Sequence, residues 1–343
     1  MAQSGEIKRQ DTLRFLQALR LQARGEPSLV IADSPWSPTI SLLLGAVLPA
    51  SCAIAVWEGR RAVALAQITR QSGRVQWELM HLVIAGLEAH SLAEHSAEHT
   101  WLLMLLDEVC RQAADRRMPS LVARVAEESS LVAPFRRADF SIAMQERTYA
   151  LSLPFVVTAP EAPGLRRQER HDAWPLHKLY LRSTPQAVRL SEGITARDWQ
   201  LQRSSSRFSF QVTRWVVEEQ DGIAGWLSEA PGRNGELRAQ LGVAKGHLGL
   251  ARDLAATALV HARERGSSRV WSRVPAYATD VCQALESLGF VETGRDVVLR
   301  RTFAIRARDM ALAQEAKRRV SRRGLASPQN RALTVSAHPW ARN

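Results

Sequence analysis

The sequence predicts a mixed α/β protein built from two tandem copies of one domain, each a mostly antiparallel mixed sheet flanked by helices. Residues 105–151 and 256–303 show the same succession of an amphipathic helix, a short basic turn, a β-rich run, a second helix and a final strand. Three strand-like runs with short turns between them precede the first helix of each copy. The repeat is the size of a domain, which indicates a duplication.

The leading strands of the first copy are "SCAIAVWEG", "RAVALAQIT" and "VQWELMHLVI", and those of the second are "TRWVVEEQDG", "IAGWLSEAPG" and "GELRAQLGV". Strands joined by short turns run antiparallel, whereas a helix after the third strand permits a parallel crossover to the fourth. We therefore expect the order β-β-β-α-β-α-β in each copy. Phe140 and Phe290, which follow the second helix of each copy, should occupy equivalent positions.

Composition suggests where the domains begin and end. Prolines and a glycine in residues 154–168 disfavour regular structure and place a boundary near residue 158. The expected parts are domains at 1–158 and 159–307 and a basic tail at 308–343, which holds 8 Lys and Arg against 2 Asp and Glu. The end of the tail lacks periodicity and is expected to be disordered. A basic tail can bind nucleic acid or anionic lipid, but a solvated tail is the simpler interpretation.

The cysteines Cys52, Cys110 and Cys282 lie far apart in apolar contexts and show no metal-binding spacing. They predict buried free thiols in a reducing compartment. The most apolar run, residues 39–56, is interrupted by Pro49 and is interpreted as a buried helix and strand rather than a membrane span. We expect a cytoplasmic protein without a metal or a membrane partner, for which nucleic-acid binding is limited to the tail.

The stretch "KGHLGLARDL" follows the third strand of the second copy and opens a helix. The N–H groups of a first helical turn have no intrahelical partner and carry partial positive charge, which suits a pyrophosphate. Gly249 allows close backbone approach and Ala251 is small enough to permit it, while Lys245, His247 and Arg252 add positive charge. The alternative is that the glycines serve only a tight turn and a helix start.

The order of elements, this loop–helix and the ending "ESLGF" resemble the GCN5-related N-acetyltransferases (GNAT) over most of residues 30–305. The resemblance implies an acetyl-CoA site whose loop reads (Arg or Gln)-x-x-Gly-x-(Gly or Ala). The pattern falls on residues 246–251, after a strand ending at Val243, with Gly246 in place of Arg or Gln. The first copy lacks a glycine at this turn and carries Trp101 near its helix start, so we expect a degenerate structural partner.

For catalysis the resemblance implies a tyrosine acid on the last helix, but Leu285 and Phe135 occupy that position. Tyr277 is the nearest replacement, with a half-buried tyrosine at the sheet edge as the alternative. Attack by an amine also needs a proton acceptor. The candidates are Glu236, at the start of a strand, and Glu229, in the loop before it, and both can equally be surface carboxylates.

The predicted function is acetyl-CoA-dependent N-acetyl transfer by the second copy to a small-molecule amine or an N-terminal amine. The acceptor would bind near residues 172–200, where Arg182, Arg189 and Arg197 favour an acidic acceptor unless they are simply solvated. The competing hypothesis is a non-catalytic binding or assembly protein that kept the fold and lost the chemistry.

Overall fold

A computed structural model of the protein describes residues 2–6, 51–70, 77–86, 96–152, 162–200, 212–220, 222–232 and 235–303. The expected boundary near residue 158, the helix expected before residue 51 and the basic tail lie outside these residues.

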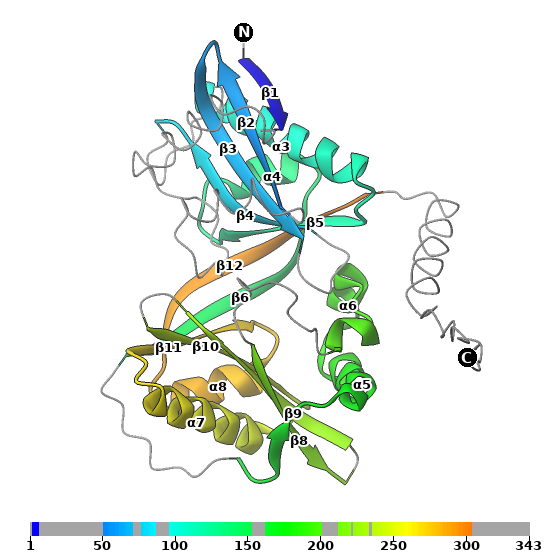
Figure 1. The fold of residues 1–343 in the computed structure, drawn as a ribbon, viewed down its shortest axis with the longest axis vertical. Helices are drawn as coiled ribbons and strands as arrows, with labels where there is room; N and C mark the ends of the chain where they lie inside the picture. The colour runs from blue at the N-terminus through cyan, green and yellow to red at the C-terminus, as the bar shows by residue number, and fades with distance from the viewer. Residues whose placement is uncertain are drawn as a thin grey trace, which may run out of the picture. The chain divides into compact units, whose positions relative to one another are not determined.

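The predicted order of elements is confirmed in both copies (Figure 1). The first copy contains β2 (Ser51–Glu58), β3 (Arg61–Arg70), β4 (Trp77–Ile84), α3 (Ala97–Asp115), β5 (Ser120–Ala126), α4 (Val132–Arg137) and β6 (Ser141–Ser152). The second contains β8 (Thr213–Glu219), β9 (Gly222–Pro231), β10 (Glu236–Val243), α7 (Leu248–Glu264), β11 (Arg269–Pro275), α8 (Thr279–Ser287) and β12 (Val291–Thr302).

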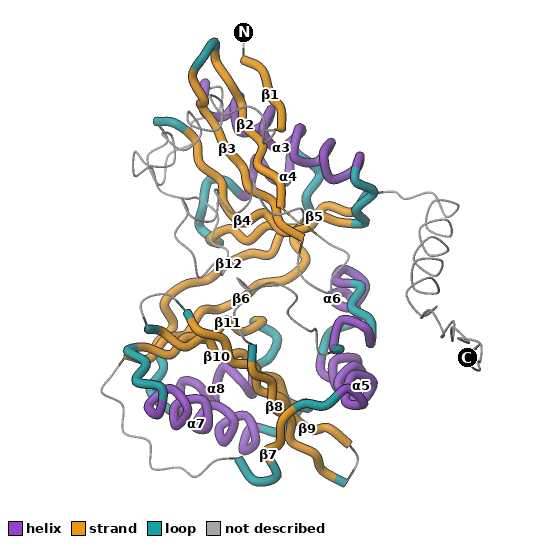
Figure 2. The backbone as a smooth tube through the Cα atoms, viewed as in Figure 1, coloured by secondary structure: helices purple, strands orange, loops and turns teal. Residues whose placement is uncertain are grey.

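Further elements precede each copy, and Figure 2 shows them by type. Strand β1 (Ala2–Glu6) pairs antiparallel with β2 at one edge of the sheet. Before the second copy come β7 (Leu165–Arg167), η1 (Arg170–Asp172), α5 (Ala173–Ser183), α6 (Gln186–Glu192) and η2 (Ala196–Trp199). The stretch 154–168, expected to lack regular structure, thus holds a short strand, because β7 pairs with β8.

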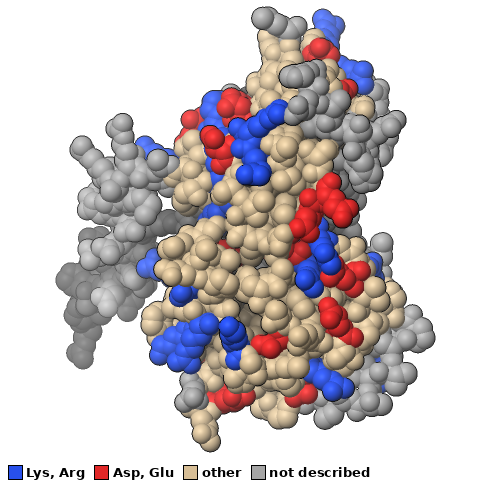
Figure 3. Space-filling view, turned by 180° about the vertical axis from the view of Figure 1, so that it is seen from behind, with Lys and Arg blue, Asp and Glu red and all other residues tan. Residues whose placement is uncertain are grey.

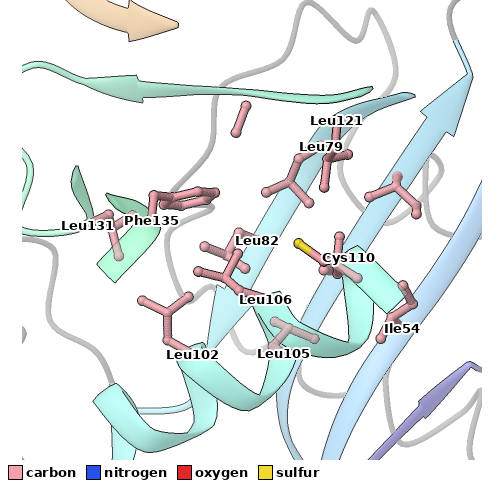
Figure 4. Close-up of a cluster of buried hydrophobic side chains, with 14 of the residues drawn as sticks. Ile54, Leu79, Leu82, Leu102, Leu105, Leu106, Cys110, Leu121, Leu131 and Phe135 are labelled. Carbon is pink, nitrogen blue, oxygen red and sulfur yellow. The ribbon is translucent and has the colours of Figure 1, made fainter. Parts of the chain in front are cut away.

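Side-chain periodicity explains why these residues form these elements. Strand β10 alternates half-buried and buried residues, which is the pattern of a strand with one covered face. On α3, apolar residues recur at three and four positions, and Leu102, Leu105, Leu106 and Val109 are fully buried. Figure 4 shows side chains of this helix pointing toward those of the neighbouring strands in the core of the first copy.

The equivalence of Phe140 and Phe290 is confirmed. Each follows the second helix of its copy, and each is buried, at 3% and 5% exposure. The Phe140 N–H donates to the Phe135 carbonyl and the Phe290 N–H to the Leu285 carbonyl, both at 3.1 Å. The same five-residue backbone bond therefore ends α4 and α8.

The last strands of the two copies are exchanged, which the sequence did not predict. The strands of the described residues form one sheet in the order β1-β2-β3-β4-β5-β12-β6-β11-β10-β9-β8-β7. The end of β12 pairs with β5 of the first copy, while β6 pairs with β11 of the second (Figure 1). β6 and β12 also pair with each other. Each copy's last strand thus completes the sheet of the other copy.

A cluster of buried charges marks the centre of this exchange. Glu146 and Asp296, each the sixth residue of its strand and each 6% exposed, face each other across β6 and β12. Arg124 Nε lies 2.8 Å from Glu146 Oε2, and the same guanidinium contacts Glu78. Arg273, the equivalent of Arg124 on β11, places Nε 3.7 Å from Asp296 Oδ2. We call these five residues the central charge cluster.

The expectation of free thiols is confirmed, because Cys52, Cys110 and Cys282 are all unbridged and buried. The predicted buried strand within residues 39–56 is β2, whose interior residues are all buried. Among the described helices, none is long and apolar enough to cross a membrane.

Candidate functional site

The neighbouring parallel strands β10 and β11 stop pairing partway along their length. Residues 236–238 pair with 269–271, yet β10 continues to Val243 and β11 to Pro275. Over the rest of their length β10 pairs with β9, and β11 with β6. We call residues 239–243 and 272–275 the splayed segment. Its facing edges place backbone N–H and C=O groups outside any strand ladder, ready for a ligand to pair with.

A tight turn connects β10 to α7. The His247 N–H donates to the Ala244 carbonyl at 3.2 Å. Gly246 sits at the third position of this turn with φ 85°. A type II turn demands a positive φ there, which glycine adopts without strain. The departure from Arg or Gln at this position therefore has a backbone reason.

Helix α7 begins at Leu248 with its first-turn N–H groups uncapped. His247 is its N-cap residue and makes no side-chain capping bond, and the first turn holds no acidic residue. A Cβ built on Gly249 meets nothing within 4 Å. An anion can therefore approach these N–H groups, which is the arrangement that binds phosphate in many proteins.

The equivalent helix of the first copy is capped by its own side chains. Ser96 Oγ accepts the His99 N–H at 3.1 Å, and Glu98 lies in the first turn of α3. Trp101 is partly buried against the core of the first copy. A hydroxyl and a carboxylate thus occupy the end of α3 where an anion would bind. This agrees with the expectation of a degenerate first copy, although its role as a structural partner stays a prediction.

The residues expected to hold a cofactor come together around the start of α7. Lys245 and Arg252 are exposed, and His247 Nε2 lies 3.6 Å from Glu219 Oε2. Val243 and Ala251 are buried beneath the turn, at 7% and 0% exposure. The geometry is compatible with a pyrophosphate site, while the binding itself stays a prediction.

Asp280 is a feature of this site that sequence reasoning missed. It lies in the first turn of α8, and its Oδ2 accepts the Gly246 N–H at 2.8 Å. A carboxylate oxygen therefore sits against a backbone donor of the loop, as a phosphate oxygen would. Only the packing of α8 against α7 brings the two residues together, so spacing along the chain could not reveal the contact.

Replacing Asp280 by asparagine should tighten the binding of CoA about three- to tenfold. The substitution keeps an oxygen that can accept the Gly246 N–H but removes a negative charge beside a negative ligand. Calorimetric titration of CoA would measure the change, with the exposed Glu264→Gln at the far end of α7 as the control. Weaker binding in Asp280→Asn would show that the carboxylate supports the loop rather than opposing the ligand.

Tyr277 lies at the same end of the sheet as the loop. β10 and β11 are parallel, so both end at the same edge of the sheet, and Tyr277 lies two residues after the end of β11. Its hydroxyl is hydrogen bonded to Thr184, and burial raises the pKa of the phenol to about 12. The phenol therefore stays protonated at neutral pH and can donate a proton, although its role as the acid stays a prediction.

The two candidate bases, Glu236 and Glu229, lie away from the loop and Tyr277. Glu236 begins β10 beside Arg269, at 3.5 Å, and about 23 Å of extended strand separates it from Val243. Glu229 lies on β9 rather than in a loop, and it is 1% exposed rather than on the surface. Its oxygens contact His261 Nδ1 and Arg265 Nη2, both at 2.7 Å. Glu229 is thus fixed in a buried ion pair near the C-terminal end of α7.

Aromatic side chains cover the face of β10 opposite α7. A Cβ built on Gly242 would lie 2.6 Å from Trp226 Nε1, so the indole requires a glycine there. The ring of Trp199 lies 5.8 Å from that of Trp226 and 6.1 Å from that of Tyr180 on α5. This series of rings connects the splayed segment with the helices expected to bind the acceptor.

Three arginines lie on these helices, Arg182 on α5, Arg189 on α6 and Arg197 on η2. Arg182 and Arg197 are exposed, whereas Arg189 has its Nε buried without a hydrogen bond. On the face shown in Figure 3, basic and acidic side chains lie interspersed, with one group of Lys and Arg near the lower left edge. Preference for an acidic acceptor stays a prediction. Within the described part of the chain, no three His, Cys, Asp or Glu residues gather as possible metal ligands.

Comparison with solved structures identifies the fold. A tandem GNAT protein from the clavulanic acid biosynthesis pathway matches with a TM-score of 0.55 and 15% identity over 89% of this chain and 100% of its own. A GCN5-related N-acetyltransferase from Sphaerobacter thermophilus matches with a TM-score of 0.56 and 17% identity over 88% of this chain and 95% of its own. Saccharomyces cerevisiae N-myristoyltransferase with bound myristoyl-CoA gives a TM-score of 0.50 and 12% identity over 89% of this chain and 83% of its own.

No family model matches the sequence, and no curated protein matches it significantly. The structural similarities show that this chain has a tandem GNAT fold, as the sequence predicted. Their identities are low, so they establish the architecture and leave the activity to be argued from the residues.

Proposed function

We propose that the second copy binds an acyl-CoA, with acetyl-CoA as the expected donor, and transfers its acyl group to an amine. The observation that most supports this is the meeting, at one edge of the sheet, of an uncapped helix start with parallel strands that stop pairing. The first feature suits a pyrophosphate and the second suits an extended arm with amide groups.

The residues of the second copy fit such a ligand. The first-turn N–H groups of α7 would hold the pyrophosphate, with Lys245 and Arg252 adding charge from the surface. Backbone groups of the splayed segment that lie outside the β10–β11 pairing would pair with the pantetheine amides. Tyr277, protonated at neutral pH, would donate a proton toward the departing thiolate. The amine acceptor would approach from the side of α5 and Trp226.

A non-catalytic binding or assembly protein is the second candidate. It is favoured by the Asp280 carboxylate on the Gly246 N–H, which competes with an anionic ligand. It is also favoured by the ion pair of Glu236 with Arg269, which leaves no identified base at the splayed segment. Such a protein would keep the fold without turnover.

An assay of thiol release separates the two candidates. Acetyl-CoA is incubated with the protein and a set of small amines and short peptides with free N-termini, and a thiol reagent detects released CoA. The three cysteines of the chain are buried, so the protein itself should contribute little signal. Amine-dependent release would support the enzyme, whereas binding of acetyl-CoA without release from any acceptor would favour the binding protein.

A further inference from the structure

The hydroxyl of Ser272 is buried at a place where the fold gives it nothing to bond. Ser272 is 1% exposed, and its Oγ has no hydrogen-bond partner among the described residues. Val270 and Val274, the inward neighbours on β11, belong to the hydrophobic core of the second copy. Burying a hydroxyl without a partner is unfavourable, so an apolar side chain would suit the folded protein better.

The first copy shows that this position does not need a hydroxyl. β5 and β11 are equivalent strands of seven residues, and the fourth residue is Ala123 in β5 and Ser272 in β11. Ala123 is 0% exposed, so alanine fills the position in a closely related setting. The serine occurs in the copy whose helix start is uncapped, and the alanine in the copy whose helix start is capped.

Ser272 lies at the closed end of the splayed segment. It is the first residue of β11 beyond the last pair with β10, Arg238 with Trp271. It stands opposite Tyr149 of β6, whose hydroxyl donates to Glu286 of α8 at 2.7 Å. Directly opposed residues point to the same face of a sheet, so Ser272 faces the side covered by α8.

The length of the splayed segment sets how far Ser272 lies from the loop at the start of α7. The start of α7 lies at the open end, and β10 spans about 16 Å from Arg238, its last residue paired with β11, to Val243. An extended pantetheine arm is of comparable length. A ligand with its pyrophosphate on the first turn of α7 therefore brings its thioester beside Ser272.

We propose that the Ser272 hydroxyl donates a hydrogen bond to the thioester of the acyl-CoA bound by the second copy, an inference that rests on the proposed function. During transfer the amine nitrogen bonds to the thioester carbon, and the carbon–sulfur bond breaks. The ammonium gives up two protons in all, one to solvent and one that ends on the CoA sulfur. A hydroxyl at the thioester stabilises the charge that develops as this bond breaks.

The test compares Ser272→Ala with the wild-type full-length protein in two measurements. Without ligand, the melting temperature of Ser272→Ala should rise by about 2–4 °C, because an unpartnered buried hydroxyl is removed. In calorimetry, the variant should bind acetyl-CoA roughly three- to tenfold more weakly, the loss of one neutral hydrogen bond. Its affinity for desulfo-CoA, which keeps the pyrophosphate and the arm but lacks the sulfur, should be unchanged.

Ser120→Ala is the matched control. Ser120 is also 1% exposed and lies on the equivalent strand β5, but its Oγ accepts a bond from Arg300 Nη2 at 2.7 Å. That variant should therefore melt at a lower temperature and bind both ligands as the wild type does.

Four outcomes would overturn the inference. A lower melting temperature of Ser272→Ala would show that the hydroxyl serves the fold. Equal binding of acetyl-CoA by the variant and the wild type, or an equal loss for acetyl-CoA and desulfo-CoA, would show that Ser272 does not contact the thioester while leaving the proposed function intact. Failure of the wild type to bind either ligand would remove the proposed function and this inference together.

Discussion

Replacing Arg124 by alanine should lower the free energy of unfolding by about 3–5 kcal/mol, the usual loss when a buried ion pair is broken from one side. Arg124 contacts Glu78 and Glu146, which are 7% and 6% exposed. Its removal leaves these carboxylates and Asp296 with Arg273 as the remaining cation of the central charge cluster. Denaturant unfolding at pH 7 would measure the loss.

The control is Arg295→Ala, whose side chain is 59% exposed on β12 and pairs with Glu292, itself 26% exposed. That variant should lose at most about 1 kcal/mol. An equally small loss for Arg124→Ala would show that the cluster does not hold the exchanged strands together.

Gly249→Asp should weaken the binding of acetyl-CoA at least tenfold while leaving the fold intact. The new side chain points into open space, so it strains nothing in the free protein. A carboxylate in the first turn of a helix is favourable for the helix, typically by about 0.3–1 kcal/mol. The same carboxylate repels the pyrophosphate and covers the N–H groups that would bind it. Stability and affinity should therefore change in opposite directions.

Gly249→Asn separates charge from size. It has nearly the same shape as the aspartate variant without the charge, so it should weaken binding by a smaller factor. Calorimetry gives the affinities, and thermal unfolding without ligand gives the stabilities. If Gly249→Asp binds acetyl-CoA as tightly as the wild type, the ligand is held elsewhere.

The succession of elements could be predicted because each depends on local periodicity. The alternation in β10 and the three-and-four spacing on α3 are visible in the letters, and the repeat of the pattern revealed the duplication. The strand exchange could not be predicted, because β6 of the first copy pairs with β11 and β12 of the second, and β12 pairs with β5 and β6 of the first. Tyr149 illustrates this, since it belongs to the first copy and is buried in the core of the second.

In the candidate site, too, features set by neighbouring residues could be predicted and features set by packing could not. The glycine spacing located the turn and the start of α7, because those features depend on neighbouring residues. Asp280 could not be placed, since its contact with Gly246 depends on how α8 packs. For Ser272 the sequence offered a partial signal, a polar residue between two inward valines in "RVWSRV". That its hydroxyl lacks a partner is visible only in the folded protein.

The most direct test of acyl-CoA binding by the second copy is the stoichiometry of acetyl-CoA in a calorimetric titration of the wild-type chain. Both copies have parallel strands that part early. Of the equivalent helices α3 and α7, however, α7 has an uncapped start, whereas Ser96 and Glu98 occupy the start of α3. We expect one molecule of acetyl-CoA bound per chain. No heat at millimolar acetyl-CoA, or two molecules bound per chain, would contradict it.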